Sequence, residues 1–371
     1  MADNYGSVER DGLKIKAAPG TGDDEDEQDI IEFNPLYTYP MFGEQEQIFG
    51  YKDLVINLEF ASGSLTSCFS MGYKDKKPTA DKIYTTMKDF LPHDIIDNHD
   101  LFTQIAQRDY NEFRPMGTKV AEYRIAREGA ENSVFEFYQA TFETPRFLEY
   151  HKRLQCFAIF FIEGASFIED TDNKWEIRLL FERVSENGQE TYNFVGYCTM
   201  YPYYYYPEHI RMRISQFLIL PPYQQQGHGS RLYQLLYNDF CSRKDVLEMT
   251  VEDPNDEFSD LRDKNDVRHL TVQGVFKDIR APITNETILK VAKEHKLTKR
   301  QASRCFEMAL LRNLDKRNKA QYKAFRLQVK QRLYKHNAEA LATLDKADRI
   351  EKLQETFLSV EEDYHRLLAL L

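Results

Sequence analysis

The chain has 371 residues, about twice the size of one typical domain, so we expect two or three domains. Hydrophobic residues make up 42% and aromatic residues 13%, which excludes wholesale disorder. No stretch approaches the roughly 18 uncharged apolar residues of a membrane-spanning helix, and the N-terminus lacks a secretory pattern. The five cysteines are widely spaced and form no CxxC motif, which argues against a zinc site or a disulfide framework. We therefore expect a soluble intracellular protein without a metal site.

The formal net charge of −11 hides a strong asymmetry along the chain. Residues 290–335 contain 15 Lys/Arg and three acidic residues, a local net charge of +12, so the remainder carries −23. An acidic body repels nucleic acid and attracts basic partners, whereas the basic segment needs an explanation of its own.

The N-terminal part divides into two predicted regions. Residues 1–29 are rich in Gly, Asp and Glu, and we predict a disordered acidic tail. Residues 30–144 mix short strands with helical stretches, such as a strand at 54–60 and a helix at 80–90. We interpret them as an α+β N-terminal domain.

Residues 145–270 alternate between strands and helices. We predict a helix at 147–162, two strands at 175–184 and 192–201 joined through Asn187-Gly188, a strand at 213–220, a helix at 230–241 and a strand at 246–252. This order places a strand–loop–helix–strand unit at the centre of the chain.

Residues 271–371 are predicted to be helical. Thr298 and Gln301 have the spacing of a capping box for a helix that runs to about residue 314. Apolar residues repeat at spacings of three and four between Ile350 and Leu367, which predicts an amphipathic helix. Such a face packs either on its own domain or on a partner chain.

The most informative stretch is QFLILPPYQQQGHGS at residues 216–230, a Gly-spaced loop between a strand and the first turn of a helix. Free N–H groups at a helix N-terminus bind phosphate oxygens, and Gly227 and Gly229 let the backbone approach a diphosphate. No Gly-Lys-Ser/Thr follows and GxGxxG is absent, so neither a P-loop nor a dinucleotide fingerprint is indicated.

The form Gln/Arg-x-x-Gly-x-Gly resembles the pyrophosphate loop of the GCN5-related N-acetyltransferases, and Gln224, Gly227 and Gly229 match it. Several longer segments resemble the type B histone acetyltransferase catalytic subunits, and their sequences are most like those of the fungal members. These segments are residues 48–52, 161–168, 196–207, 216–230, 250–255 and 261–263. The resemblance covers about residues 30–270; beyond it only a helical extension matches. It implies a mixed α/β protein with a central GCN5-related N-acetyltransferase fold at 145–270, an α+β N-terminal domain and a helical C-terminal domain at 271–371.

The resemblance also implies which residues bind acetyl-CoA. Phe217, Leu218 and Ile219 would pair their backbone with the pantetheine amides. They could also simply form a buried strand, and both can hold because the pairing uses the backbone and leaves the side chains for the core. Asn255 would contact the cofactor near its thioester. The pyrophosphate would be held by the loop residues Gln224, Gln225, Gln226, Gly227, His228, Gly229 and Ser230. We expect His228 to be an exposed loop residue rather than a base or a metal ligand.

For catalysis, the resemblance places a general base at Glu252, with Glu163 and Asp253 as supporting acids. The alternative is that Glu252 is a solvated acid at a strand end or a helix cap. A lysine pKa near 10.4 leaves roughly 1 free amine in 2,500 at pH 7, so a base is required. Neither Cys198 nor Cys241 lies in a nucleophile motif, which favours direct transfer.

The implied substrate is the tail of newly made histone four, and the implied partner is a WD40-repeat histone-binding subunit. Trp175 could equally be core, and the tyrosine run at 203–206 a half-buried strand or a loop. The tail groove would include Glu44, Gln45, Glu46, Trp175, Tyr201, Pro202 and Tyr203. We expect the protein in cytoplasm and nucleus, with no membrane and no sequence-specific nucleic acid.

Two other functions fit parts of the sequence. The basic segment 290–335, with two helical stretches within 285–314 that could form a helix-turn-helix, suits a chromatin or nucleic-acid-binding protein. An acetyltransferase of the same fold could also act on a small amine, which the large N-terminal domain argues against.

Overall fold

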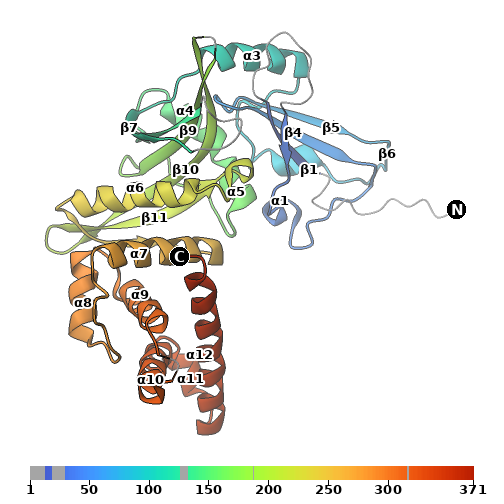
Figure 1. The fold of residues 1–371 in the computed structure, drawn as a ribbon. Helices are drawn as coiled ribbons and strands as arrows, with labels where there is room; N and C mark the ends of the chain where they lie inside the picture. Colours follow the sequence, from blue (N-terminus) through green and yellow to red (C-terminus); the bar gives the residue numbers. More distant parts are fainter. Residues whose placement is uncertain (1–12, 19–29, 126–132, 187, 316) are drawn as a thin grey trace. The chain divides into compact units, whose positions relative to one another are not determined.

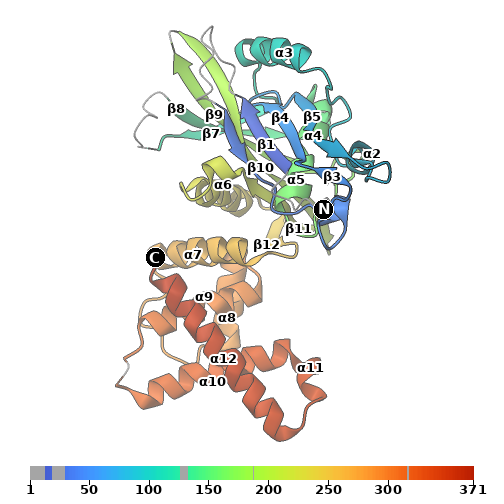
Figure 2. The same cartoon turned by 90° about the vertical axis from the view of Figure 1, so that its right-hand side faces the viewer.

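The computed structural model describes residues 13–18, 30–125, 133–186, 188–315 and 317–371 (Figure 1 and Figure 2). The chain divides into two compact units, which we describe separately. The first unit comprises Met1–Tyr201 and Ile214–His228, and the second comprises Pro202–Arg213 and Gly229–Leu371. The domain boundaries expected from the sequence remain a prediction.

The first unit contains a four-stranded sheet in the order β2-β1-β4-β5. β1 pairs parallel to β4 and antiparallel to β2, and β4 pairs antiparallel to β5. The strands are β1 (Leu13–Ala18), β2 (Ile31–Phe33), β4 (Val55–Ala61) and β5 (Ser67–Gly72). The predicted disordered tail is wrong at β1: Leu13 and Ile15 are buried, because their alternation gives the strand one apolar face. The rest of 1–29 lies outside the described residues.

The second sheet has six strands in the order β12-β11-β10-β9-β8-β7. The pairs β7–β8, β8–β9 and β9–β10 are antiparallel. The predicted hairpin between β9 and β10 is confirmed, and Gly188 takes the positive φ of 81° that its turn requires. The strands are β7 (Thr118–Tyr123), β8 (Ser133–Ala140), β9 (Glu176–Glu186), β10 (Gln189–Tyr205), β11 (His209–Ile219) and β12 (Val246–Val251).

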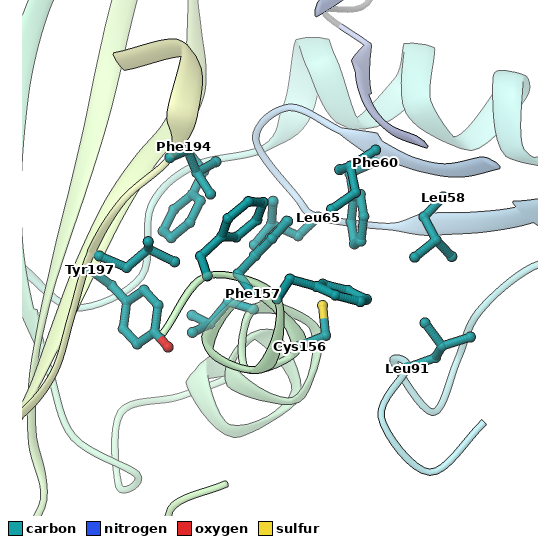
Figure 3. Close-up of a cluster of buried hydrophobic side chains, with 14 of the residues drawn as sticks. Leu58, Phe60, Leu65, Leu91, Cys156, Phe157, Phe194 and Tyr197 are labelled. Atoms are coloured by element: carbon teal, nitrogen blue, oxygen red, sulfur yellow. The ribbon is translucent and has the colours of Figure 1, made fainter. Parts of the chain in front are cut away.

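The core of the first unit is built around a short buried helix. The helix predicted at 147–162 is two helices, α4 (Phe147–Leu154) and α5 (Cys156–Phe161), and every residue of α5 is buried. Phe157 of α5 contacts Phe60 of the four-stranded sheet and Phe194 of the six-stranded sheet, with ring centroids 4.8 and 6.3 Å away (Figure 3). This helix therefore joins the two sheets through aromatic packing.

The remaining elements of the first unit are short apart from α3. The helix predicted at 80–90 is confirmed only over α2, which is one turn long. A two-stranded ribbon pairs β3 with β6. The bounds are β3 (Tyr51–Lys52), β6 (Asp75–Lys76), α1 (Tyr39–Phe42), α2 (Ile83–Met87) and α3 (His99–Glu112).

The second unit is helical beyond β12, as predicted. α9, α10 and α12 contact one another, and Phe325, Phe357 and Tyr364 are buried among them. The predicted seam of the last helix is confirmed except at its start: Phe357, Tyr364 and Leu367 are buried and Leu353 and Val360 half-buried, whereas Ile350 is 58% exposed. The helices are α6 (His228–Ser242), α7 (Asp256–Val272), α8 (Asn285–Glu294), α9 (Lys299–Arg312), α10 (Lys319–His336), α11 (Ala338–Ala342) and α12 (Lys346–Leu368).

Only half of the predicted capping box forms at the start of α9. The Thr298 hydroxyl accepts a hydrogen bond from the backbone N–H of Gln301 at 3.1 Å, as expected. The Gln301 side chain does not return to the N-cap; it donates to the buried carboxylates of Asp263 and Asp266 on α7. In the described part of the chain, no helix is long and apolar enough to cross a membrane.

Candidate active site

The loop after β11 is held in shape by its own glutamines. η3 (Pro221–Tyr223) follows the strand, and α6 begins at His228. The Gln224 amide donates to the carbonyl of Ile219 at 2.8 Å, and the Gln226 amide donates to the carbonyl of Pro222 at 2.8 Å. The first bond ties the loop to the end of β11, and the second closes the loop onto η3. The predicted loop glutamines therefore support the backbone, while Gln225 has a φ of 58° and is exposed.

Gly227 leaves open space where a side chain would stand. Its φ is 86°, and a Cβ built on it would meet no heavy atom within 4 Å. The first turn of α6, which includes Gly229 and Ser230, presents backbone N–H groups that no preceding helical turn can satisfy. Bare backbone at a helix N-terminus is able to bind a diphosphate. In the second unit, the Ser230 hydroxyl accepts from Asn265 at 3.1 Å, which fixes that side chain.

The prediction that His228 is an exposed loop residue is wrong. It is 1% exposed, its Nδ1 lies 2.6 Å from the hydroxyl of Tyr123, and its ring lies 4.4 Å from that of Phe135. His228 is the first residue of α6, and its side chain points toward β7 and β8. There its imidazole ring packs against aromatic rings and forms a hydrogen bond with the Tyr123 hydroxyl. His228 thus anchors the loop to the sheet. Tyr123 was missed because nothing local in the sequence links residues 105 positions apart.

The strand before the loop is well packed. Leu218 and Ile219 are buried and Phe217 is half-buried, so the buried-strand interpretation holds for the side chains and leaves the backbone proposal open. Gln216, which the sequence analysis gave no role, accepts from the Tyr197 hydroxyl at 3.0 Å and donates to the carbonyl of Ser166 at 2.9 Å. These buried bonds fix the strand that carries the loop.

In the second unit, acidic residues follow β12. Glu252 is exposed and its carboxylate lies 4.0 Å from the guanidinium of Arg213. Arg213 in turn lies over the ring of Tyr203, 4.4 Å from its centroid. Asp253 is exposed with a φ of 30°. The Asn255 side chain accepts from the N–H of Phe258 at 2.9 Å and so caps α7.

The residues predicted for a peptide groove in the first unit differ in their freedom. Glu44 and Gln45 are exposed, but the Glu46 carboxylate accepts from the N–H groups of Thr38 and Tyr39 at 2.6 and 3.0 Å. Glu46 therefore stabilises its own loop at α1. Glu163 is exposed in the turn after α5.

Aromatic residues of the predicted groove lie directly before β9 and in the last third of β10. Trp175 and Tyr201 are half-buried, with ring centroids 4.9 Å apart in a T-shaped contact. The Tyr201 hydroxyl donates to Asp172 at 2.7 Å, a bond that lowers the pKa of that carboxyl. In the second unit, Pro202 is half-buried and Tyr203 is 41% exposed. The tyrosine run is a strand as far as Tyr205.

Within the described residues, no group of three or more His, Cys, Asp or Glu side chains could hold a metal ion.

Three family models match the chain. "Histone acetyl transferase HAT1 N-terminus" matches residues 9–163, "Acetyltransferase (GNAT) family" matches residues 133–257, and "Fungal HAT1, C-terminal" matches residues 263–315. The acetyltransferase model covers the loop at 224–230 and Glu252, and the third model lies in the region where the sequence alone gave only a general likeness.

Curated relatives cover nearly the whole chain. A histone acetyltransferase type B catalytic subunit of Cryptococcus neoformans (strain JEC21) is 39% identical over 381 residues, covering 93% of this chain and 92% of that protein. That of Mycosarcoma maydis is 40% identical over 90% of this chain and 82% of its own length. That of Homo sapiens is 33% identical over 92% of this chain and 88% of its own length. The chain belongs to the type B histone acetyltransferase catalytic subunits.

Membership of this family makes the chain an acyltransferase with a mixed α/β acetyltransferase domain, which confirms the predicted fold class and enzyme class. Acetyltransferases of this kind use acetyl-CoA. Among solved structures, an aminoglycoside acetyltransferase from a soil metagenomic sample is 18% identical, covers 34% of this chain and 82% of its own, and has a TM-score of 0.25. That likeness is too low to add to the assignment.

Proposed function

We propose that this chain transfers the acetyl group of acetyl-CoA to lysine side chains in the N-terminal tail of newly synthesised histone four, with Glu252 as general base. The single observation that carries the proposal is the similarity over more than nine-tenths of the chain to type B histone acetyltransferase catalytic subunits. The geometry of the loop and the exposed acid after β12 supports it.

The loop at residues 224–230 fits the diphosphate of acetyl-CoA. Gly227 leaves open space beside its backbone. The side-chain amides of Gln224 and Gln226 donate hydrogen bonds to carbonyls of Ile219 and Pro222, which holds the loop in shape. When bound, acetyl-CoA supplies an acetyl thioester whose carbonyl a free amine can attack. The chain's own contribution is to hold the diphosphate on the N–H groups that open α6.

Glu252 would remove the proton that keeps the substrate lysine inert. Bringing an amine of pKa near 10.4 to its neutral form at pH 7 costs about 4.6 kcal/mol. A carboxylate within reach can accept the proton as the amine attacks. Glu252 is exposed after the end of β12, and its carboxylate lies 4.0 Å from the guanidinium of Arg213. Asp253 and Glu163 are exposed acids that would attract the cationic lysine.

The exposed acids and aromatic rings suit a basic, glycine-rich tail. Glu44 and Gln45 are exposed, and Trp175 and Tyr201 present half-buried rings that can contact lysine stems and glycine backbone. Tyr203 presents its ring on the second unit. We leave Glu46 out of this set, because its carboxylate is committed to α1.

We also propose a WD40-repeat histone-binding subunit as partner, and activity in cytoplasm and nucleus. The relatives are named catalytic subunits, which supports a second subunit. The competing nucleic-acid function has less support: Arg304 and Arg332 of the basic segment are paired with the buried carboxylates of Asp263 and Glu307.

The test is mass spectrometry of a core-histone mixture incubated with the purified chain and acetyl-CoA. We expect acetylation on lysines of the histone four tail, with spermidine turned over far more slowly. Equal or faster turnover of spermidine, or acetylation spread over all core histones without preference, would contradict the proposal. Duplex DNA binding with a steep salt dependence and no acetylation would favour the nucleic-acid alternative.

A further inference from the structure

The helical part of the second unit contains a cavity that the acetyltransferase reaction does not use. It has a volume of about 470 Å³ and is lined by residues of α8, α9 and the C-terminal half of α10. Pockets of roughly 300–1,000 Å³ hold small molecules in proteins. The cavity is therefore large enough for a ligand of its own.

The charge of its wall is strongly one-sided. Among the described residues, Glu307 is the one acid in the wall, and Arg332 neutralises it: the guanidinium Nε donates to both carboxylate oxygens at 2.9 and 3.0 Å. The Tyr364 hydroxyl donates to the same carboxylate at 2.8 Å. Three further cations in the wall have no ion-pair partner within the described part of the chain: Lys299, Arg300 and Lys335.

Two hydrogen-bond donors in the wall also lack acceptors among the described residues. The Gln328 Oε1 accepts from the N–H of Ile283 at 2.7 Å, but its Nε2 is buried without a partner. Because an unpaired buried donor loses its hydrogen bonds to water without replacement, such a group favours an acceptor from outside the chain. Arg332 uses Nε and Nη2 on Glu307 and Tyr364, and no acceptor in the described residues takes its Nη1.

The cations also crowd one another. The pKa of Arg300 is lowered by burial and by the positive charges of Arg304 and Arg332. A nearby anion would remove this repulsion and satisfy the open donors at the same time.

We propose that this cavity binds a small molecule carrying several phosphate groups. Uncompensated cations within one cavity call for more negative charge per volume than a single carboxylate offers, and guanidinium groups match phosphate oxygens in pairs. A volume of about 470 Å³ is that of a small-molecule pocket, which favours a compact ligand over an extended nucleic-acid backbone. The site is separate from acetyl transfer and does not depend on the proposed histone specificity.

The test is calorimetric titration of the full chain with inositol hexakisphosphate as the probe, compared with inorganic phosphate. We expect the probe to bind at least 30-fold more tightly than inorganic phosphate. Arg300→Glu and Lys335→Glu should each weaken binding of the probe at least tenfold. Lys323→Glu is the matched control, because Lys323 is exposed on the opposite face of α10, outside the cavity, and it should leave the affinity unchanged.

A second variant separates the site from general charge. Gln328→Glu keeps the oxygen that accepts from Ile283 but replaces the orphaned donor with an acceptor. We expect an unaltered melting temperature and at least tenfold weaker binding of the probe. The proposal is overturned if inorganic phosphate binds as tightly as the probe, if Lys323→Glu weakens binding as much as Lys335→Glu, or if duplex DNA or poly-glutamate displaces the probe at equal charge concentration.

Discussion

At the scale of single residues, Gly227 combines a positive φ, which favours glycine, with open space where a side chain would stand. Its φ of 86° disfavours a β-branched side chain, and the added atoms would stand where we place the diphosphate. Gly227→Val should weaken acetyl-CoA binding at least tenfold by calorimetry.

The matched control for this change is Gly188→Val in the β9–β10 hairpin. Gly188 has a similar φ of 81° and equally open surroundings, so its replacement brings the same backbone strain, of order 1–3 kcal/mol, outside the loop. Acetyl-CoA affinity should be unchanged there. Equal affinities in Gly227→Val and the wild type would remove the loop from cofactor binding.

His151 on α4 should make the first unit sensitive to acid. It is 1% exposed, packs against Phe142, and neither ring nitrogen has a hydrogen-bond partner in the described residues. Burial lowers its pKa to about 4, from 6.5. Because the folded pKa is depressed, the unfolded chain binds the proton more readily, so stability falls as the pH drops from 6.5 toward 4.

The full pKa difference corresponds to roughly 3 kcal/mol, most of it lost by pH 4.5. Urea unfolding of wild type and His151→Phe at pH 7 and pH 4.5 measures it. The wild type should lose about 2–3 kcal/mol more than the variant over this interval. Parallel losses in both proteins would show that other groups cause the acid sensitivity.

His228 and Glu46 show why residue-scale prediction stopped short. The motif located the loop correctly, but two glycines beside His228 suggested exposure, and its Tyr123 partner lies 105 positions away. Glu46 was predicted to line the tail groove beside Glu44, whereas its carboxylate oxygen accepts from two N–H groups at α1. In both cases a distant or backbone partner, which leaves no trace in local composition, decides the role.

At the scale of elements, Gln301 distinguishes a helix cap from a buried network. A capping box accepts Glu in place of Gln at this position. Here Gln301 donates to Asp263 and Asp266, and burial raises the pKa of Asp266 to about 6. Gln301→Glu would add a third carboxylate to this buried pair.

We expect Gln301→Glu to destabilise the protein by about 3 kcal/mol or more, since a buried charge is left uncompensated. Thr298→Ala, which removes only the N-cap bond, should cost about 1 kcal/mol. Thermal unfolding of the two variants checks this order. If the Gln301→Glu variant is as stable as the wild type, Gln301 acts in the capping box rather than in the buried network.

The elements themselves were predictable where their pattern is local. The hairpin at Gly188, β12 and the C-terminal helices follow from turn residues and apolar spacing. The break at Gln155 between α4 and α5 was not predictable, because α5 is apolar on all sides and a continuous apolar run carries no boundary. β1 was missed because a short strand beside acidic residues gains its stability from pairing with β4.

At the scale of the whole molecule, charge is divided along the chain rather than balanced locally. The body outside residues 290–335 carries a formal charge of −23, which should attract a lysine-rich tail. Raising the salt from 50 to 300 mM should therefore increase KM for a histone four peptide several-fold at nearly constant kcat. A KM that is independent of salt in steady-state kinetics would exclude this long-range attraction.

Fold class was predictable for the whole chain, because motif and resemblance agreed with composition at every level. The role of the basic segment was not predictable, because its cations could have bound DNA, bound a partner protein or paired with buried acids. The structure divides them: Arg304 and Arg332 pair with buried acids, whereas Lys299, Arg300 and Lys335 line the cavity of the second unit.

The central claim is that Glu252 accepts the proton of the attacking lysine. The most direct measurement is single-turnover acetylation of a histone four peptide by Glu252→Gln at saturating acetyl-CoA, with Glu248→Gln as control. Glu248 lies on the same strand and pairs with Arg211, so the control makes the same charge change nearby. We expect Glu252→Gln to lower the rate about 100-fold or more while acetyl-CoA affinity stays within twofold, and Glu248→Gln to react nearly normally. A Glu252→Gln enzyme that acetylates the peptide at the wild-type rate at neutral pH would contradict the account.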